Sequence, residues 1–151
     1  MDESTTTAAI SALNRIMELE LAGVVKYTHY SLMIYGFTRI PIVSWMKGNA
    51  DESLAHAHKA GELVTLLGGH PSLKIGPLLE TEHHDIGDIL RESLAHEKTA
   101  LVAYYDLLKI VQDQSVHLEE YARDMIVIEE LHQDEVDKML RRPGDTAVFS
   151  G

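Results

Sequence analysis

The sequence predicts an all-α protein, an antiparallel four-helix bundle with one long crossover connection. Apolar residues recur every three or four positions through four long segments, which is the period of an amphipathic helix. All four prolines fall at or beyond the ends of these segments. The first and last connections are short and the middle one is long, as in bundles with one crossover. The predicted helices cover residues of about 5–35, 41–67, 83–112 and 115–141.

The first two helices are predicted by their faces and their ends. Leu13 and Tyr27 lie on one apolar face of the first, and Gly36 would end it. The second has Pro41 near its first turn, where a missing N–H is harmless, and ends at Gly68-Gly69. These two helices should therefore form an antiparallel pair.

The second pair follows the crossover, which we assign to the segment GGHPSLKIGPLLET. Leu90 and Leu94 share a face of the third helix, and Met125 lies on the inward seam of the fourth, which ends at RRPG. We expect one domain, residues 1–151, in which 143–151 form a flexible tail.

Composition limits the function. The chain has no cysteine, so any metal must be bound by oxygen and imidazole. A formal net charge of −11 argues against nucleic acid and anionic membranes, which need clustered basic residues. The start, MDESTTTAAISALNR, lacks the pattern of a signal peptide, and no apolar run is long enough to span a membrane. We therefore expect a soluble, cytoplasmic protein with cations among its partners.

Acidic residues interrupt the apolar faces of two helices. Glu20 lies seven residues before Tyr27, and Glu97 lies seven before Tyr104, so each acid shares the inward face of its helix. The tyrosines could hydrogen-bond these carboxylates, transfer electrons or fill the core.

The last helix carries a Glu-x-x-His motif. Met125, Glu129, His132 and Val136 follow a 4-3-4 spacing, which is one inward seam. This spacing turns the carboxylate and the imidazole toward the same point in the core.

An internal repeat relates the two halves of the chain. Glu97 lies 77 residues after Glu20, and His132 lies 76 residues after His56. The first two helices are therefore similar to the last two, which adds His56 to the buried polar residues.

Several acids in one core need compensation. A buried carboxylate without a partner is expensive, and the inward seams offer no Lys or Arg. Divalent metal ions would neutralise the acids, because carboxylate and imidazole are ordinary ligands of iron, manganese and zinc. One Glu from each of two helices and a Glu-x-x-His from each of the others is the pattern of ferritin-like di-iron bundles.

The sequence resembles the bacterioferritin and ferritin-like superfamily over residues of about 8 to 142. The segments that carry the resemblance are ALNRIMELELAGVVKY, LGGHPSL, LRESLAHEKTAL and EELHQDEVDKML. It implies a di-iron centre, with manganese or zinc as substitutes, in which Glu20, Glu97, Glu129 and His132 are ligands. Glu129 or Glu97 would bridge the two ions.

The second helix departs from that pattern. Ser53 stands three residues before His56, where the family has a glutamate. Glu52, four residues before His56, could reach the metal from its flank, so we include Glu52 and His56 in the candidate site. Leu54 stands where bacterioferritins have the methionine that binds haem, so haem is not expected.

The resemblance implies a ferroxidase-type oxidoreductase that binds and oxidises Fe(II) for iron storage or detoxification. Dioxygen or peroxide would accept the electrons. Two alternatives remain: a rubrerythrin-like protein that reduces peroxide at a dimetal site, and an oligomeric scaffold with a degenerate metal site.

Assembly and the other histidines complete the predictions. An apolar cluster near the first link exceeds what one core needs, which predicts a homo-oligomer built from two-fold dimers, alone or within a 12- or 24-subunit shell. Its residues are Tyr30, Ile34, Ile40, Ile42 and Trp45. We expect the following histidines at the surface or behind the ligands: His58, His70, His83, His84 and His96.

Overall fold

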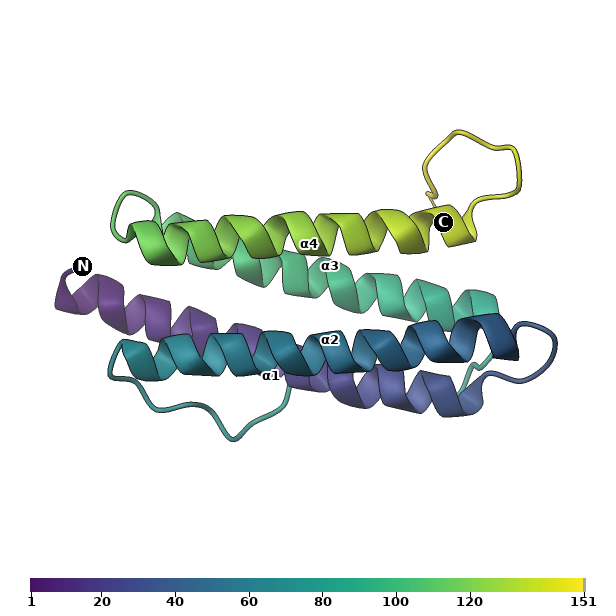
Figure 1. Ribbon diagram of the computed structural model, residues 1–151, viewed down its shortest axis with the longest axis horizontal. Coiled ribbons are helices and arrows are strands. Elements are labelled where there is room, and N and C mark those ends of the chain that lie inside the picture. The colour runs from purple at the N-terminus through teal and green to yellow at the C-terminus, as the bar shows by residue number, and fades with distance from the viewer. Residues whose placement is uncertain (151) are drawn as a thin grey trace.

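The computed structural model, which describes residues 1–150, confirms the all-α bundle with its long crossover (Figure 1). The helices are α1 (Glu3–Met33), α2 (Arg39–Leu66), α3 (Ile86–Val111) and α4 (Val116–Leu140). No strand occurs among the described residues. Each helix is antiparallel to its partner in the pairs α1–α2 and α3–α4, whereas α2 and α3 run in the same direction (Figure 1).

The helix ends follow from local capping. The Asp2 side chain accepts a hydrogen bond from the Thr5 N–H at 2.7 Å, which caps α1. The helix ends at Met33, before Gly36, whose φ of 87° suits glycine. In α3 the Asp85 side chain caps the first turn, so the helix begins at Ile86 rather than near residue 83 as predicted.

The crossover follows the outer side of α1. Asn14 donates to the His70 carbonyl at 3.1 Å and accepts from the Ser72 N–H at 2.8 Å. Further along, the Gly76 N–H donates to the Glu18 carbonyl at 2.8 Å. A Cβ at Gly76 would lie 3.1 Å from that carbonyl oxygen, so the close approach depends on glycine.

The core has two apolar halves with a polar layer between them. Leu13, Leu107 and Leu118 belong to one half, and Met46 and Ile89 to the other. The buried acids of α1, α3 and α4 lie between these halves along their helices. The fold therefore places carboxylates at mid-bundle, as their sequence spacing predicts.

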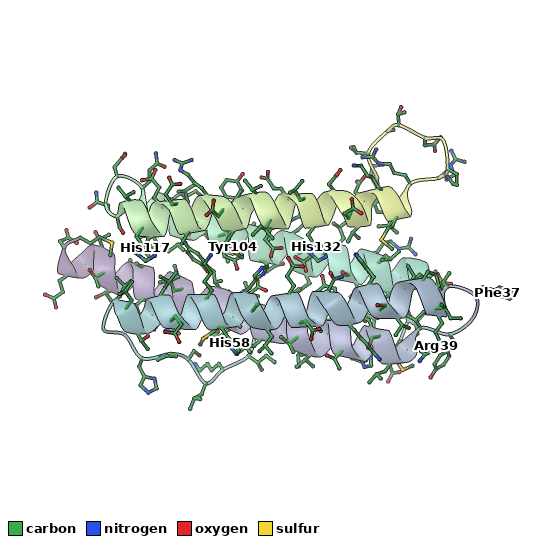
Figure 2. All side chains as sticks on the ribbon, viewed as in Figure 1. Phe37, Arg39, His58, Tyr104, His117 and His132 are labelled. Atoms are coloured by element: carbon green, nitrogen blue, oxygen red, sulfur yellow. The ribbon has the colours of Figure 1, made fainter. Side chains whose placement is uncertain are left out.

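The prediction that the whole first-link cluster exceeds the needs of one core is wrong. Tyr30 and Ile34 are 3% and 1% exposed, and Ile42 and Trp45 pack partly against the same core half. Ile40, in contrast, is 89% exposed. The exposed apolar residues around this link are Leu32, Tyr35, Phe37 and Ile40 (Figure 2 labels Phe37).

The C-terminal segment, expected to be flexible, folds back on α4. The Phe149 N–H donates to the Asp137 carboxylate at 2.9 Å, and the Phe149 ring packs against the second core half. Within the described residues, no helix is both long and apolar enough to cross a membrane.

Candidate metal centre

The polar layer contains three carboxylates from three helices. Glu20 of α1, Glu97 of α3 and Glu129 of α4 are 4%, 4% and 3% exposed. The side chains of His56 from α2 and His132 from α4 are 14% and 15% exposed. Figure 2 shows His132 directed into the space between the helices. The structure thus brings together residues from all four helices, at positions that the heptad spacing and the Glu-x-x-His motif predict.

The first group of donor atoms comes from Glu20, His56 and Glu129. His56 Nδ1 lies 3.6 Å from a Glu20 oxygen and 3.9 Å from a Glu129 oxygen. One donor atom from each residue lies within 4.8 Å of the others, a spacing at which one ion could contact all three.

The second group comes from Glu97, Glu129 and His132. His132 Nδ1 lies 3.4 Å from a Glu97 oxygen, and the three donor atoms again lie within 4.8 Å of one another. Among the described residues, Glu129 alone belongs to both groups. Of the two bridging candidates, the geometry therefore favours Glu129.

Each of the two core tyrosines donates a hydrogen bond to a buried glutamate of the other half of the chain. Tyr27 of α1 donates to Glu97 of α3, and Tyr104 of α3 donates to Glu20 of α1 at 2.9 Å. The Ser93 hydroxyl donates to the Tyr27 oxygen at 3.1 Å. The acid in each half of the chain is thus oriented by a tyrosine from the other half.

Crowding of carboxylates changes their ionisation. Burial, the contact with Glu97 and the charges of neighbouring acids raise the pKa of Glu129 to about 12. Burial by itself would raise the pKa of Glu97, but hydrogen bonds with Glu129 and His132 outweigh it and lower this pKa to about 2. Burial lowers the pKa of an imidazole, yet the close carboxylates of Glu20 and Glu97 raise the pKa of His56 and His132 respectively. Without metal, a proton on Glu129 thus relieves repulsion within the site.

Two atoms of the site are buried without a hydrogen-bond partner. These are Oε2 of Glu129 and Nε2 of His132. Among the described residues, no Lys or Arg pairs with Glu20, Glu97 or Glu129. Unpaired donor atoms, excess negative charge and a carboxylate–imidazole donor set all fit divalent transition-metal ions.

The α2 side of the site has fewer carboxylates. Ser53 is 7% exposed and packs on Gly23, where an added Cβ would lie 2.9 Å from the Ser53 hydroxyl. Glu52 lies outside both donor groups: its side chain is 48% exposed, with one oxygen 3.7 Å from His56 Nε2. Glu52 therefore lies on the exposed flank of the site, close to His56 but outside both donor groups.

Two more ring side chains lie near the site: Trp45, which the sequence placed in the first-link cluster, and His96, which it placed at the surface or behind the ligands. Trp45 of α2 lies against His132, with ring centroids 5.9 Å apart, and so covers one side of the imidazole. His96 is buried beside Gly23, and burial lowers its pKa. Both contacts join different helices, which helical periodicity alone does not reveal.

The comparisons place the chain in a family. Residues 10–143 match the Ferritin family model, described as a ferritin-like domain, so the chain belongs to the ferritin-like proteins. No curated protein matches it.

Two solved structures show the same fold. One, from Bacillus anthracis, is described as a ferritin-like, diiron-carboxylate protein; it is 21% identical, with a TM-score of 0.87 over 93% of this chain and 100% of that one. The other is Rhodobacter capsulatus bacterioferritin with a metal-free dinuclear site and haem iron; it is 22% identical, with a TM-score of 0.81 over 87% of this chain and 82% of that one.

Proposed function

We propose that this protein is a non-haem di-iron member of its family that binds Fe(II) between its helices and oxidises it for storage or detoxification. The observation that carries the proposal is the pair of overlapping donor groups that share Glu129. The dinuclear and diiron-carboxylate descriptions of the two structural neighbours support the same assignment.

The candidate ligands would form two iron positions. Glu20 and His56 would hold one Fe(II), Glu97 and His132 would hold the other, and Glu129, which belongs to both donor groups, would be shared by the two. The Tyr104 and Tyr27 hydroxyls keep the outer carboxylates in place. Glu129 must lose its proton as the ions bind, because a protonated carboxyl group cannot bridge two cations.

Iron supplies the electrons for the reaction. Two Fe(II) lose one electron each, which with two protons reduces one dioxygen to hydrogen peroxide or one peroxide to two waters. The buried carboxylates favour Fe(III) over Fe(II), because the higher positive charge gains more from them. The α1–α2 position should bind its ion more weakly, because Ser53 stands three residues before His56 in place of a glutamate.

Assembly and location complete the proposal. We infer a cytoplasmic homo-oligomer built from two-fold dimers, supported by the exposed apolar residues Leu32, Tyr35, Phe37 and Ile40. We propose no haem site, because Leu54 occupies the position of the haem methionine and is 40% exposed.

Rubrerythrin-like reduction of peroxide is the second candidate function, since the same donor set would serve it. Ser53 is the one feature that favours a degenerate scaffold.

The test is aerobic Fe(II) oxidation followed by absorbance in wild type and two histidine variants. His132→Ala should remove the activity and keep the helical content, because the imidazole contributes a ligand and no main-chain contact. His117→Ala is the matched control: it lies on α4 but is exposed, and Figure 2 shows it near the start of that helix. If wild-type protein oxidises Fe(II) no faster than buffer, or both variants keep full activity, the proposal is wrong.

A further inference from the structure

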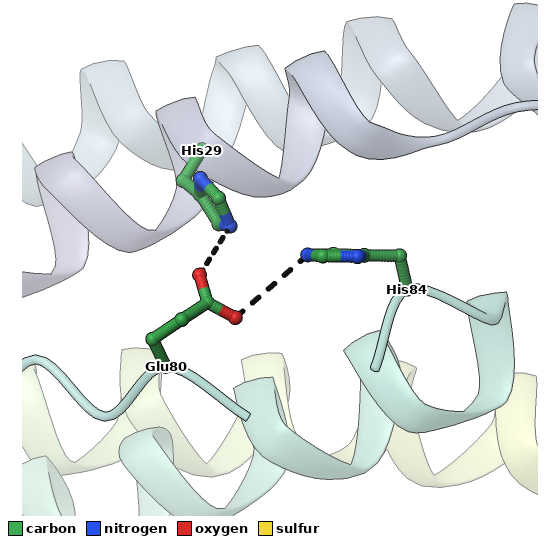
Figure 3. Close-up of side chains that lie close together, drawn as sticks. All are labelled: His29, Glu80 and His84. Carbon is green, nitrogen blue, oxygen red and sulfur yellow. Dashed lines mark ion pairs between the residues drawn. The ribbon is translucent and has the colours of Figure 1, made fainter. Parts of the chain in front are cut away.

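A second cluster of potential ligands lies away from the bundle centre. His29 belongs to α1, whereas Glu80 and His84 belong to the crossover, and the three side chains turn toward one another (Figure 3). None of them contributes to either donor group at mid-bundle. The cluster is therefore independent of the proposed ferroxidase site.

The distances suit one small ion. His29 Nε2 lies 2.9 Å from one Glu80 oxygen, and His84 Nε2 lies 3.8 Å from the other. The imidazole centroids are 5.6 Å apart. Donors held tetrahedrally at about 2.0–2.1 Å from zinc are about 3.3 Å apart, and the two observed separations bracket this value.

A simple ion pair does not account for the imidazole atoms. Nε2 of His29 and Nε2 of His84 are both shielded from water, and neither makes a hydrogen bond of normal geometry. Buried polar atoms without a hydrogen-bond partner call for an explanation, and an ion between the two nitrogens and the carboxylate would provide one. Two imidazoles with one carboxylate form a common set of protein ligands for divalent transition metals.

There is room for further ligands. A cavity of about 190 Å³ borders the cluster and is lined by His29 and Glu80, together with Lys26, Tyr30 and Glu92. Water molecules in this cavity could fill the positions that three protein ligands leave open.

We propose that His29, Glu80 and His84 bind one divalent transition-metal ion, of which zinc is the best match, and that this ion fastens the crossover to α1. Among the described residues, Gly76 makes the last main-chain hydrogen bond from the crossover to α1, so the ion would secure the segment that follows it. The bound ion would connect residues 51 or more positions apart in the chain.

The test counts bound zinc and records its effect on stability. Wild type, Glu80→Gln and His84→Ala are titrated with Zn²⁺ by calorimetry, and the thermal midpoint is measured with and without the metal. The two variants should bind one zinc fewer per chain than wild type and lose part of the rise in midpoint. His83→Ala is the matched control, because this neighbouring histidine is exposed and lies outside the cluster.

Two further measurements make the result decisive. Circular dichroism checks that every variant keeps its helical content, and anomalous scattering at the zinc edge from a zinc-loaded crystal locates each ion. A peak between the two imidazoles supports the site. No peak there, an unchanged zinc count in His84→Ala, or an equal loss in His83→Ala overturns it. Failure of iron oxidation would not affect these readouts, so the two proposals are tested separately.

Discussion

Replacing Glu129 by glutamine should stabilise the metal-free protein, and the gain should grow with pH. Burial and the neighbouring acids raise the pKa of Glu129 from 4.5 to about 12. Between these values the unfolded chain has released a proton that the folded chain keeps. The unfolded state then binds fewer protons, so the free energy of unfolding falls as pH rises. Glutamine resembles the protonated acid in shape and removes this proton uptake.

The size of this stabilisation is set by the pKa that Glu129 has in the unfolded chain. As long as the folded pKa lies well above 7, the cost at pH 7 depends only on the distance from 4.5 to 7, about 2.5 pH units. At about 1.4 kcal/mol per unit, the stabilisation by Glu129→Gln is on the order of 3 kcal/mol at pH 7. Near pH 4.5 this contribution disappears.

The assay is urea unfolding of chelator-treated protein at pH 5, 6, 7 and 8, with the protein concentration held fixed. The difference between Glu129→Gln and wild type should increase by about 1.4 kcal/mol for each pH unit. Glu120→Gln, on the exposed side of α4, is the matched control for the effect of the substitution itself. A constant difference for Glu129→Gln would mean that Glu129 is ionised in the folded protein, which refutes the reasoning.

Three other outcomes are expected. Metal binding at pH 7 should release at least one proton, from Glu129, so its calorimetric enthalpy should vary with the ionisation enthalpy of the buffer; no variation would contradict a protonated acid. Gly23→Ala should destabilise the fold by about 1–3 kcal/mol in urea unfolding, because the new Cβ meets the Ser53 hydroxyl at 2.9 Å, whereas Gly48→Ala, with open space around it, should not. Ser53→Glu should tighten Fe(II) binding at the α1–α2 position; unchanged affinity there would show that the new acid does not reach the ion.

The mid-bundle site could be predicted because its residues follow helical periods. Seven-residue spacing placed Glu20 and Glu97 on inward faces, and the three-residue spacing of Glu129 and His132 turned both toward one point. His56 followed from the repeat. A helix fixes the direction of each side chain, so spacing was sufficient to place Glu20, Glu97, Glu129 and His132 on inward faces.

The rest of the structure depends on contacts without a period. The crossover has no regular structure, so nothing in its sequence indicated that Glu80 and His84 would meet His29. The sequence places Tyr30 in an apolar cluster beyond the needs of one core, because it does not show that the ring is enclosed and that the hydroxyl reaches Glu92 at 2.7 Å. Such positions are set by the packing of one element on another.

The crosswise hydrogen bonds of the core tyrosines have a consequence for the ancestry of the fold. Tyr27 holds the acid of the second hairpin, and Tyr104 holds the acid of the first. A symmetric dimer of a single ancestral hairpin would make the same pair of reciprocal tyrosine–glutamate hydrogen bonds. In such a dimer, any change of a ligand would occur twice.

Joining the two copies in one chain removes that constraint, because each position can then mutate alone. Ser53 and Glu129 occupy corresponding places in the two hairpins, 76 residues apart, and only Glu129 carries a carboxylate. A tandem chain can thus change the ligands of one half of a paired site and leave the other half intact. The two metal positions can then become unequal, whereas in a homodimer of identical hairpins they must stay the same.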